Sequence, residues 1–187
     1  MEAFLISTGI VALAEIGDKT QLLSLVLAAR FKRPYTIILG IFIATVVNHA
    51  LAGSVGAWVN AQLGPEVMRW ILGISFVVIG LWMLIPDKLD ETAARNVASK
   101  YGVLATTVIA FFLAEMGDKT QFATVALAAR FDALFAVVLG TTLGMMLANV
   151  PVVLLGRAAA SRLPTRAINL TAAILFVCMG LAAFVFD

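Results

Sequence analysis

The sequence carries one charged motif twice, and each copy lies inside an apolar segment long enough to cross a membrane. The copies are AEIGDKTQ at residues 14–21 and AEMGDKTQ at residues 114–121. An ionised side chain near the centre of a bilayer costs about 3 kcal/mol even on the lenient insertion scale. The three ionisable residues in each motif therefore predict a pathway for an ion or a charged substrate.

The four carboxylates of the two motifs are the residues that we predict to bind a metal ion. Within each motif the Glu and the Asp are three positions apart, so we expect them to lie on one helical face. Symmetry between the copies would bring all four together. Two lysines offset part of the charge, and the remaining excess of about two negative charges suits a divalent cation bound by hard oxygen ligands. The predicted ligands are Glu15, Asp18, Glu115 and Asp118, with Lys19 and Lys119 as charge balance.

Neutral polar residues close to the carboxylates are predicted to support this site. Gly17 and Gly117 have low helix propensity, so we expect a local break at each motif that frees backbone carbonyls for the ion. The second helix of each half adds polar side chains near mid-membrane, for which interhelical hydrogen bonding is the alternative role. The supporting residues are Thr20, Gln21, Thr120 and Gln121 in the motifs, and Asn48, His49 and Asn149 in the second helices.

Three other interpretations of the motifs remain open at this point. The Glu and Lys of each motif are four positions apart and could form structural ion pairs, although buried pairs rarely improve stability over apolar packing. Two membrane carboxylates that share a proton are typical of intramembrane aspartyl proteases, but that site has no use for the paired Glu and Lys. A passive cation channel also selects with acidic side chains. We predict no enzyme activity, no catalytic residue and no cofactor.

The composition predicts an all-α integral membrane protein. Of 187 residues, 62% are hydrophobic and only 13% are charged, which is too apolar for a soluble domain. The single transmembrane domain divides into a first three-helix repeat at 1–86, a cytoplasmic linker at 87–100 and a second repeat at 101–187. The six predicted spans are Ala3 to Ala29, Tyr35 to Asn60, Val67 to Ile85, Val103 to Ala129, Ala133 to Leu155 and Ala167 to Phe186.

The two halves are related by an offset of 100 residues. Leu13 to Phe31 matches Leu113 to Phe131 at 13 of 19 positions, and matches continue in later segments, as between Phe76 and Phe176. Because each half has three spans, the second half enters the membrane from the opposite side. The sequence thus predicts inverted-topology repeats, which in secondary transporters place the substrate site near the midplane.

The basic residues indicate orientation. The loops after the first, third and fifth spans hold nine Lys and Arg residues against two on the opposite side, which predicts that these loops are cytoplasmic and both termini outside. The net charge of +2 is not gathered into a patch, so no nucleic-acid partner is expected. The lipid bilayer is the expected surrounding, and the sequence leaves a homo-oligomer open. The single cysteine, Cys178, excludes an intramolecular disulfide and a cysteine metal cluster.

The paired motifs resemble the E-x-G-D-[KR]-[ST] pattern of the cation transporters once catalogued as uncharacterised protein family 0016, and the resemblance covers nearly the whole chain. It implies exchange of Ca²⁺ or Mn²⁺ for protons at the two acidic pairs. Without an organellar targeting extension, the chain is most similar to the bacterial inner-membrane type, which exports Mn²⁺. A Ca²⁺/H⁺ antiporter of the same fold is the alternative, since both ions accept carboxylate oxygens. Clustered, buried carboxylates repel one another, so protons are expected to compete with the metal.

Overall fold

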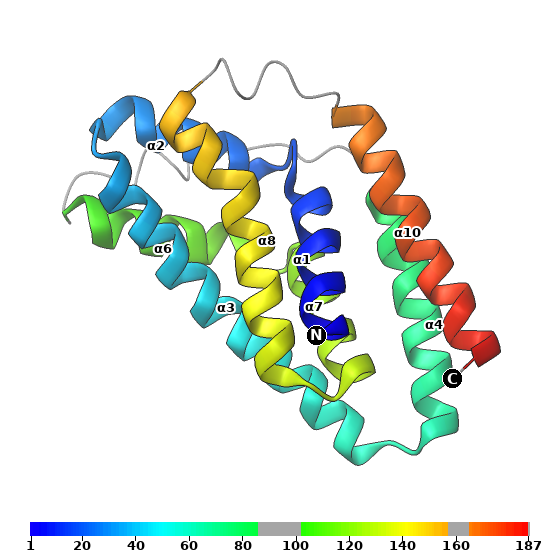
Figure 1. The fold of residues 1–187 in the computed structure, drawn as a ribbon. Helices are drawn as coiled ribbons and strands as arrows, with labels where there is room; N and C mark the ends of the chain where they lie inside the picture. Colours follow the sequence, from blue (N-terminus) through cyan, green and yellow to red (C-terminus); the bar gives the residue numbers. More distant parts are fainter. Residues whose placement is uncertain (86–101, 157–164, 187) are drawn as a thin grey trace.

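A computed structural model describes residues 1–85, 102–156 and 165–186, and these residues are helical without any strand (Figure 1). The predicted linker at 87–100 lies outside the described residues. The helices are α1 (Glu2–Glu15), α2 (Lys19–Phe31), α3 (Pro34–Gln62), α4 (Pro65–Trp82), α6 (Val103–Glu115), α7 (Lys119–Phe131), α8 (Leu134–Leu155) and α10 (Thr165–Phe186).

Four of these helices are long and apolar enough to cross a membrane, namely α3, α4, α8 and α10. The two segments that carry the motifs, predicted as single spans, are each divided into two shorter helices of 13 or 14 residues. At 1.5 Å per residue each half-helix is about 20 Å long, less than the ~30 Å hydrocarbon core of a bilayer. Only both halves together have the length of one span.

The predicted breaks are present at the glycines of the two motifs. The first break separates Glu15, the last residue of α1, from Lys19, the first residue of α2, and the second break separates α6 from α7 at the equivalent positions. Gly17 has φ +86° and Gly117 has φ +73°. In this left-handed region a Cβ atom clashes with the backbone, which explains why glycine occupies both positions.

Close helix contacts are made where a helix presents glycine. At Gly140 of α8, an added Cβ would lie 3.0 Å from the Cβ of Ser7 in α1, and at Gly40 of α3 it would lie 2.7 Å from the Cβ of Thr107 in α6. The α4 and α10 pair is equally close, because a Cβ at Gly180 would lie 2.7 Å from the Gly73 carbonyl oxygen. Small residues therefore let these helix backbones approach, as is usual in membrane bundles.

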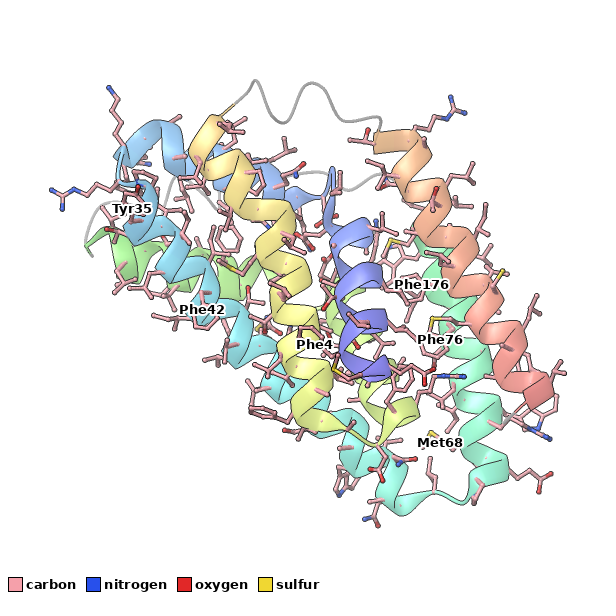
Figure 2. The ribbon with its side chains drawn as sticks, in the orientation of Figure 1. Phe4, Tyr35, Phe42, Met68, Phe76 and Phe176 are labelled. Atoms are coloured by element: carbon pink, nitrogen blue, oxygen red, sulfur yellow. The ribbon has the colours of Figure 1, made fainter. Side chains whose placement is uncertain are left out.

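The buried side chains form two apolar clusters on either side of the breaks. The first cluster comes mainly from α1, α4, α7 and α10, and it includes Phe76 and Phe176, whose ring centroids are 6.1 Å apart (Figure 2). The second comes from α2, α3, α6 and α8. Each broken segment thus has one half-helix in each cluster, and the two breaks lie where the clusters meet.

Alanine at either break glycine is expected to destabilise the protein. The left-handed conformation should cost Gly117→Ala about 1–2 kcal/mol. Gly17→Ala should cost more, because its Cβ would also meet Thr165 Cγ2 at 2.7 Å. Thermal unfolding in detergent checks both variants. Gly9→Ala is the control, because it lies within α1 with no atom within 4 Å of an added Cβ. Unfolding of G117A at the wild-type temperature would contradict this account of the break.

Candidate cation site

Three carboxylates from the two motifs converge in the interior. Glu15, Glu115 and Asp118 each offer one oxygen, and these oxygens all lie within 4.8 Å of one another. The first two side chains are fully buried and the third is 2% exposed. Such like charges repel one another strongly in a medium of low dielectric constant, so the group favours a bound cation or bound protons.

The helix breaks determine how each carboxylate is placed. Glu15 and Glu115 are the last residues of α1 and α6, where terminal carbonyls lack intrahelical partners and the helix dipole is negative. Asp118 is the N-cap of α7, at the positive end of a helix dipole. The two Glu residues thus lie at the negative ends of helix dipoles, which adds to the attraction for a cation.

Asp18 does not belong to the group of three. It is the N-cap of α2 and is 6% exposed. The sequence predicted that Glu15 and Asp18 share one helical face, and this is wrong because the helix ends between them. The same break separates Glu115 from Asp118, but there the chain brings both carboxylates to one place.

Lys19 forms an ion pair across the two motifs. Its Nζ lies 3.0 Å from Oδ1 of Asp118. The alternative pair within the first motif is not formed, since both carboxylate oxygens of Glu15 are buried without a hydrogen-bond partner. The Thr120 hydroxyl lies within hydrogen-bond distance of two carboxylate oxygens. It donates to Glu115 Oε2 at 3.0 Å, and Asp118 Oδ2 lies 3.3 Å from the same hydroxyl oxygen. Asp118 thus has a partner at both carboxylate oxygens, whereas Glu115 has one at Oε2 only, since its Oε1 is buried without a hydrogen-bond partner.

The motif glutamines brace the breaks. Gln21 Oε1 accepts a hydrogen bond from the Gly17 N–H at 3.0 Å, and its Nε2 donates to the Ala148 carbonyl of α8 at 3.1 Å. Gln121 does the same in the second half, accepting from the Gly117 N–H at 2.7 Å and donating to Asn48 of α3. The side-chain oxygen of each glutamine therefore accepts a hydrogen bond from the backbone, and its amide nitrogen ties the break to α8 or α3. The two side chains thus support the breaks instead of facing the carboxylates.

Two of the three mid-membrane polar residues connect helices. Asn149 accepts a hydrogen bond from the Ser24 hydroxyl of α2 at 2.7 Å, and Asn48 donates to the Phe112 carbonyl of α6 at 3.4 Å. Both residues thus form interhelical hydrogen bonds. Sequence reasoning missed Ser24, although position 124 also carries a hydroxyl, on Thr124, and that repetition was an available signal.

His49 and Thr20 are buried without hydrogen-bond partners. His49 is fully buried, and neither ring nitrogen has a partner. It is not a member of the carboxylate group. The Thr20 hydroxyl oxygen is likewise buried and unpartnered, unlike that of Thr120.

A cavity adjoins the break in the first motif. It has a volume of about 540 Å³ and lies between the end of α4 and the start of α10. The residues that line it are Gly17, Leu84, Thr165, Arg166, Asn169 and Leu170. Because Gly17 precedes Asp18, the cavity reaches the backbone immediately beside the acidic site.

The chain matches a protein family and several named proteins. The family model described as "Divalent cation/proton antiporter GDT1" matches residues 3–91 and 103–187. A Vibrio cholerae serotype O1 protein named "Putative manganese exporter" is 51% identical over 187 residues, covering 100% of this chain and 92% of the relative.

More distant relatives come from a cyanobacterium and a plant. "GDT1-like protein sll0615" of Synechocystis is 24% identical, over 98% of this chain and 97% of the relative. "GDT1-like protein 5" of Arabidopsis thaliana is 27% identical, over 97% of this chain and 94% of the relative. No solved structure matches the chain.

Replacing Gln21 by Leu is expected to weaken the fold. The variant leaves the Gly17 N–H and the Ala148 carbonyl without their side-chain partner. Each lost hydrogen bond contributes about 0.5–1.5 kcal/mol to stability, so the melting temperature in detergent should fall clearly. Gln62→Leu is the control, because Gln62 is exposed at the end of α3. Equal melting of Q21L and wild type would show that Gln21 does not brace the break.

Proposed function

Because the chain belongs to the GDT1 family of divalent cation/proton antiporters, we propose that it exports Mn²⁺ from a bacterial cytoplasm in exchange for protons. The observation that carries the proposal is the convergence of buried carboxylates from both motifs, Glu15 from the first and Glu115 and Asp118 from the second. The family is one of transporters and not of enzymes. Manganese as substrate is supported by the name of the Vibrio relative.

We propose all four motif carboxylates as the cation-binding residues, with Asp18 completing the site when the cation is bound. Mn²⁺ and Ca²⁺ both accept carboxylate and carbonyl oxygens, so the donor set serves either ion. A Ca²⁺/H⁺ antiporter of the same fold is therefore the second candidate. The ends of α1 and α6 supply carbonyl oxygens beside the carboxylates, as broken helices do at other transporter sites.

The proposed architecture has six spans as two inverted repeats, in which α1 with α2 and α6 with α7 each make one span. Equivalent contacts support it: Phe76 packs on its equivalent Phe176, and Gly40 meets Thr107 as Gly140 meets Ser7. The N-terminus and the end of α10 lie toward the same end of the molecule as the α3–α4 connection (Figure 1). The basic loops then face the cytoplasm and both termini lie outside the inner membrane.

Alternating access to the site is supported by an asymmetry between the repeats. α10 packs on α1, and α4 packs on α7. Repeat inversion exchanges α1 with α6 and α2 with α7, so the equivalent contacts would join α4 to α6 and α10 to α2. Among the described residues those contacts are minor. The bundle is thus closed around α1 and α7, toward the outside, and a carrier would reach its other state by exchanging the two sets of contacts.

The coupling that we propose is competition for the same oxygens. A proton or a metal ion relieves the repulsion among the carboxylates, and both cannot do so at once. Lys19 contributes by pairing with Asp118, a contact that a bound cation would replace. Facing the cytoplasm, the deprotonated site would take up Mn²⁺, and facing an acidic exterior, protons would expel it.

Each of Glu15→Gln, Asp18→Asn, Glu115→Gln and Asp118→Asn is expected to lower Mn²⁺ export at least about tenfold, equivalent to ~1.4 kcal/mol or more of lost cation binding. The amides conserve volume, so membrane expression should persist. Mn²⁺ tolerance of a sensitive bacterial host and cellular Mn²⁺ content measure the effect. Glu66→Gln, at an exposed position, is the matched control. Full tolerance with all four residues substituted would end the proposal.

Mn²⁺ transport is expected to move protons in the opposite direction. Purified protein in proteoliposomes should show Mn²⁺ movement with an opposite change in lumenal pH, and an imposed pH gradient should drive Mn²⁺ against its own gradient. Transport of Ca²⁺ with Mn²⁺ ignored would favour the second candidate. Metal movement that follows only the membrane potential, with no proton flux, would point to a channel.

A further inference from the structure

Among the described residues, the equivalent lysines of the two motifs have different partners. Lys19 forms its ion pair with Asp118 at the candidate site. Lys119 is 4% exposed, and its Nζ donates a hydrogen bond to the Ile85 carbonyl oxygen at 2.9 Å. The sequence alone assigns the two residues the same task, so the difference belongs to the conformation that the protein adopts here.

Ile85 lies at a position where an ammonium group is well placed. It follows the end of α4, whose last turn continues through bonds from Leu84 N–H to Leu81 and from Ile85 N–H to Trp82. Carbonyls at the C-terminal end of a helix lack intrahelical partners and carry the negative end of the helix dipole, so both favour a cation. The hydrogen bond therefore joins the first turn of α7 to the end of α4.

The end of α4 also forms one wall of the cavity beside the candidate cation site. Leu84, next to Ile85, lines the cavity of about 540 Å³ together with Gly17 and the start of α10. The end of α4 also packs on α7, where the ring centroids of Trp82 and Phe122 are 5.8 Å apart. Lys119 thus directly connects the start of α7, next to Asp118, to the wall of the cavity.

We propose that Lys119 is a positioning residue that fastens the end of α4 to the second motif and so controls the width of the cavity beside the cation site. The inference rests on the proposed transport function. Lys19 has the other role: it competes with the cation for Asp118.

The test separates the two lysines in the full-length protein. In a Cys178→Ser background, Asn169→Cys places a thiol on the α10 wall of the cavity, where the Asn169 Oδ1 atom is buried, and a membrane-impermeant maleimide reports its accessibility. Lys119→Met should raise the labelling rate at this position about tenfold, within the usual range of coupling between sites. Its Mn²⁺ affinity in detergent, measured by calorimetry, should stay close to wild type. Lys119→Arg should restore slow labelling, because it keeps a charged donor.

Lys19→Met is the matched control and should behave in the opposite way. Without the Lys19 ammonium group, no competitor for Mn²⁺ remains at Asp118, so Mn²⁺ affinity should increase while labelling of the cysteine at position 169 stays slow. If K119M does not accumulate in membranes, Lys119→Gln provides the comparison, since it keeps a donor without the charge. Its labelling should fall between wild type and the rate expected for K119M.

Two results would overturn the inference. One is wild-type labelling in K119M or K119Q, and the other is a K119M defect that lies entirely in Mn²⁺ affinity. Failure of the proposed function is a separate observation, because it would appear as absence of Mn²⁺ transport by the wild-type protein. The labelling comparison does not depend on that measurement.

Discussion

Burial of acidic side chains in an apolar bundle is the constraint on which this structure depends. A continuous helix uses its backbone polar groups internally, so it offers a cation side-chain oxygens but no backbone carbonyls. Glycine with positive φ ends the helix within each motif, at Gly17 and Gly117. The carbonyls at the ends of α1 and α6 then lie beside Glu15 and Glu115. Gln21 and Gln121 satisfy the glycine N–H groups that the breaks expose.

The breaks also divide each motif-bearing segment between two apolar clusters. α1 and α7 belong mainly to the cluster with α4 and α10, whereas α2 and α6 belong to the cluster with α3 and α8. The carboxylates lie at the ends of these half-helices, between the clusters. Movement of one cluster against the other would change the distances among the carboxylates without unfolding either core. A site in this position is well suited to bind and release its ion in turn.

Much of this arrangement follows from the sequence. The repeat at an offset of 100 and the motif glycines predict the two breaks. The first and last residues of α3, α4, α8 and α10 lie within three residues of the ends of the predicted apolar segments. The sequence does not predict which carboxylates converge. Asp18 and Asp118 occupy identical motif positions, yet only Asp118 joins Glu15 and Glu115. A repeated sequence specifies equivalent residues, while the contacts of each depend on the conformation of the whole bundle.

That asymmetry bears on how the site works. In a fully symmetric bundle, Lys19 and Lys119 would have equivalent partners, and neither side of the site would be distinguished from the other. Here Lys19 compensates Asp118 while Lys119 binds the end of α4. If the halves are inverted repeats, as proposed, a second arrangement with the two lysines exchanged would be comparable in energy, because it would use the same kinds of contacts. A carrier needs two such states, and near-identical motifs are a direct way to keep them in balance.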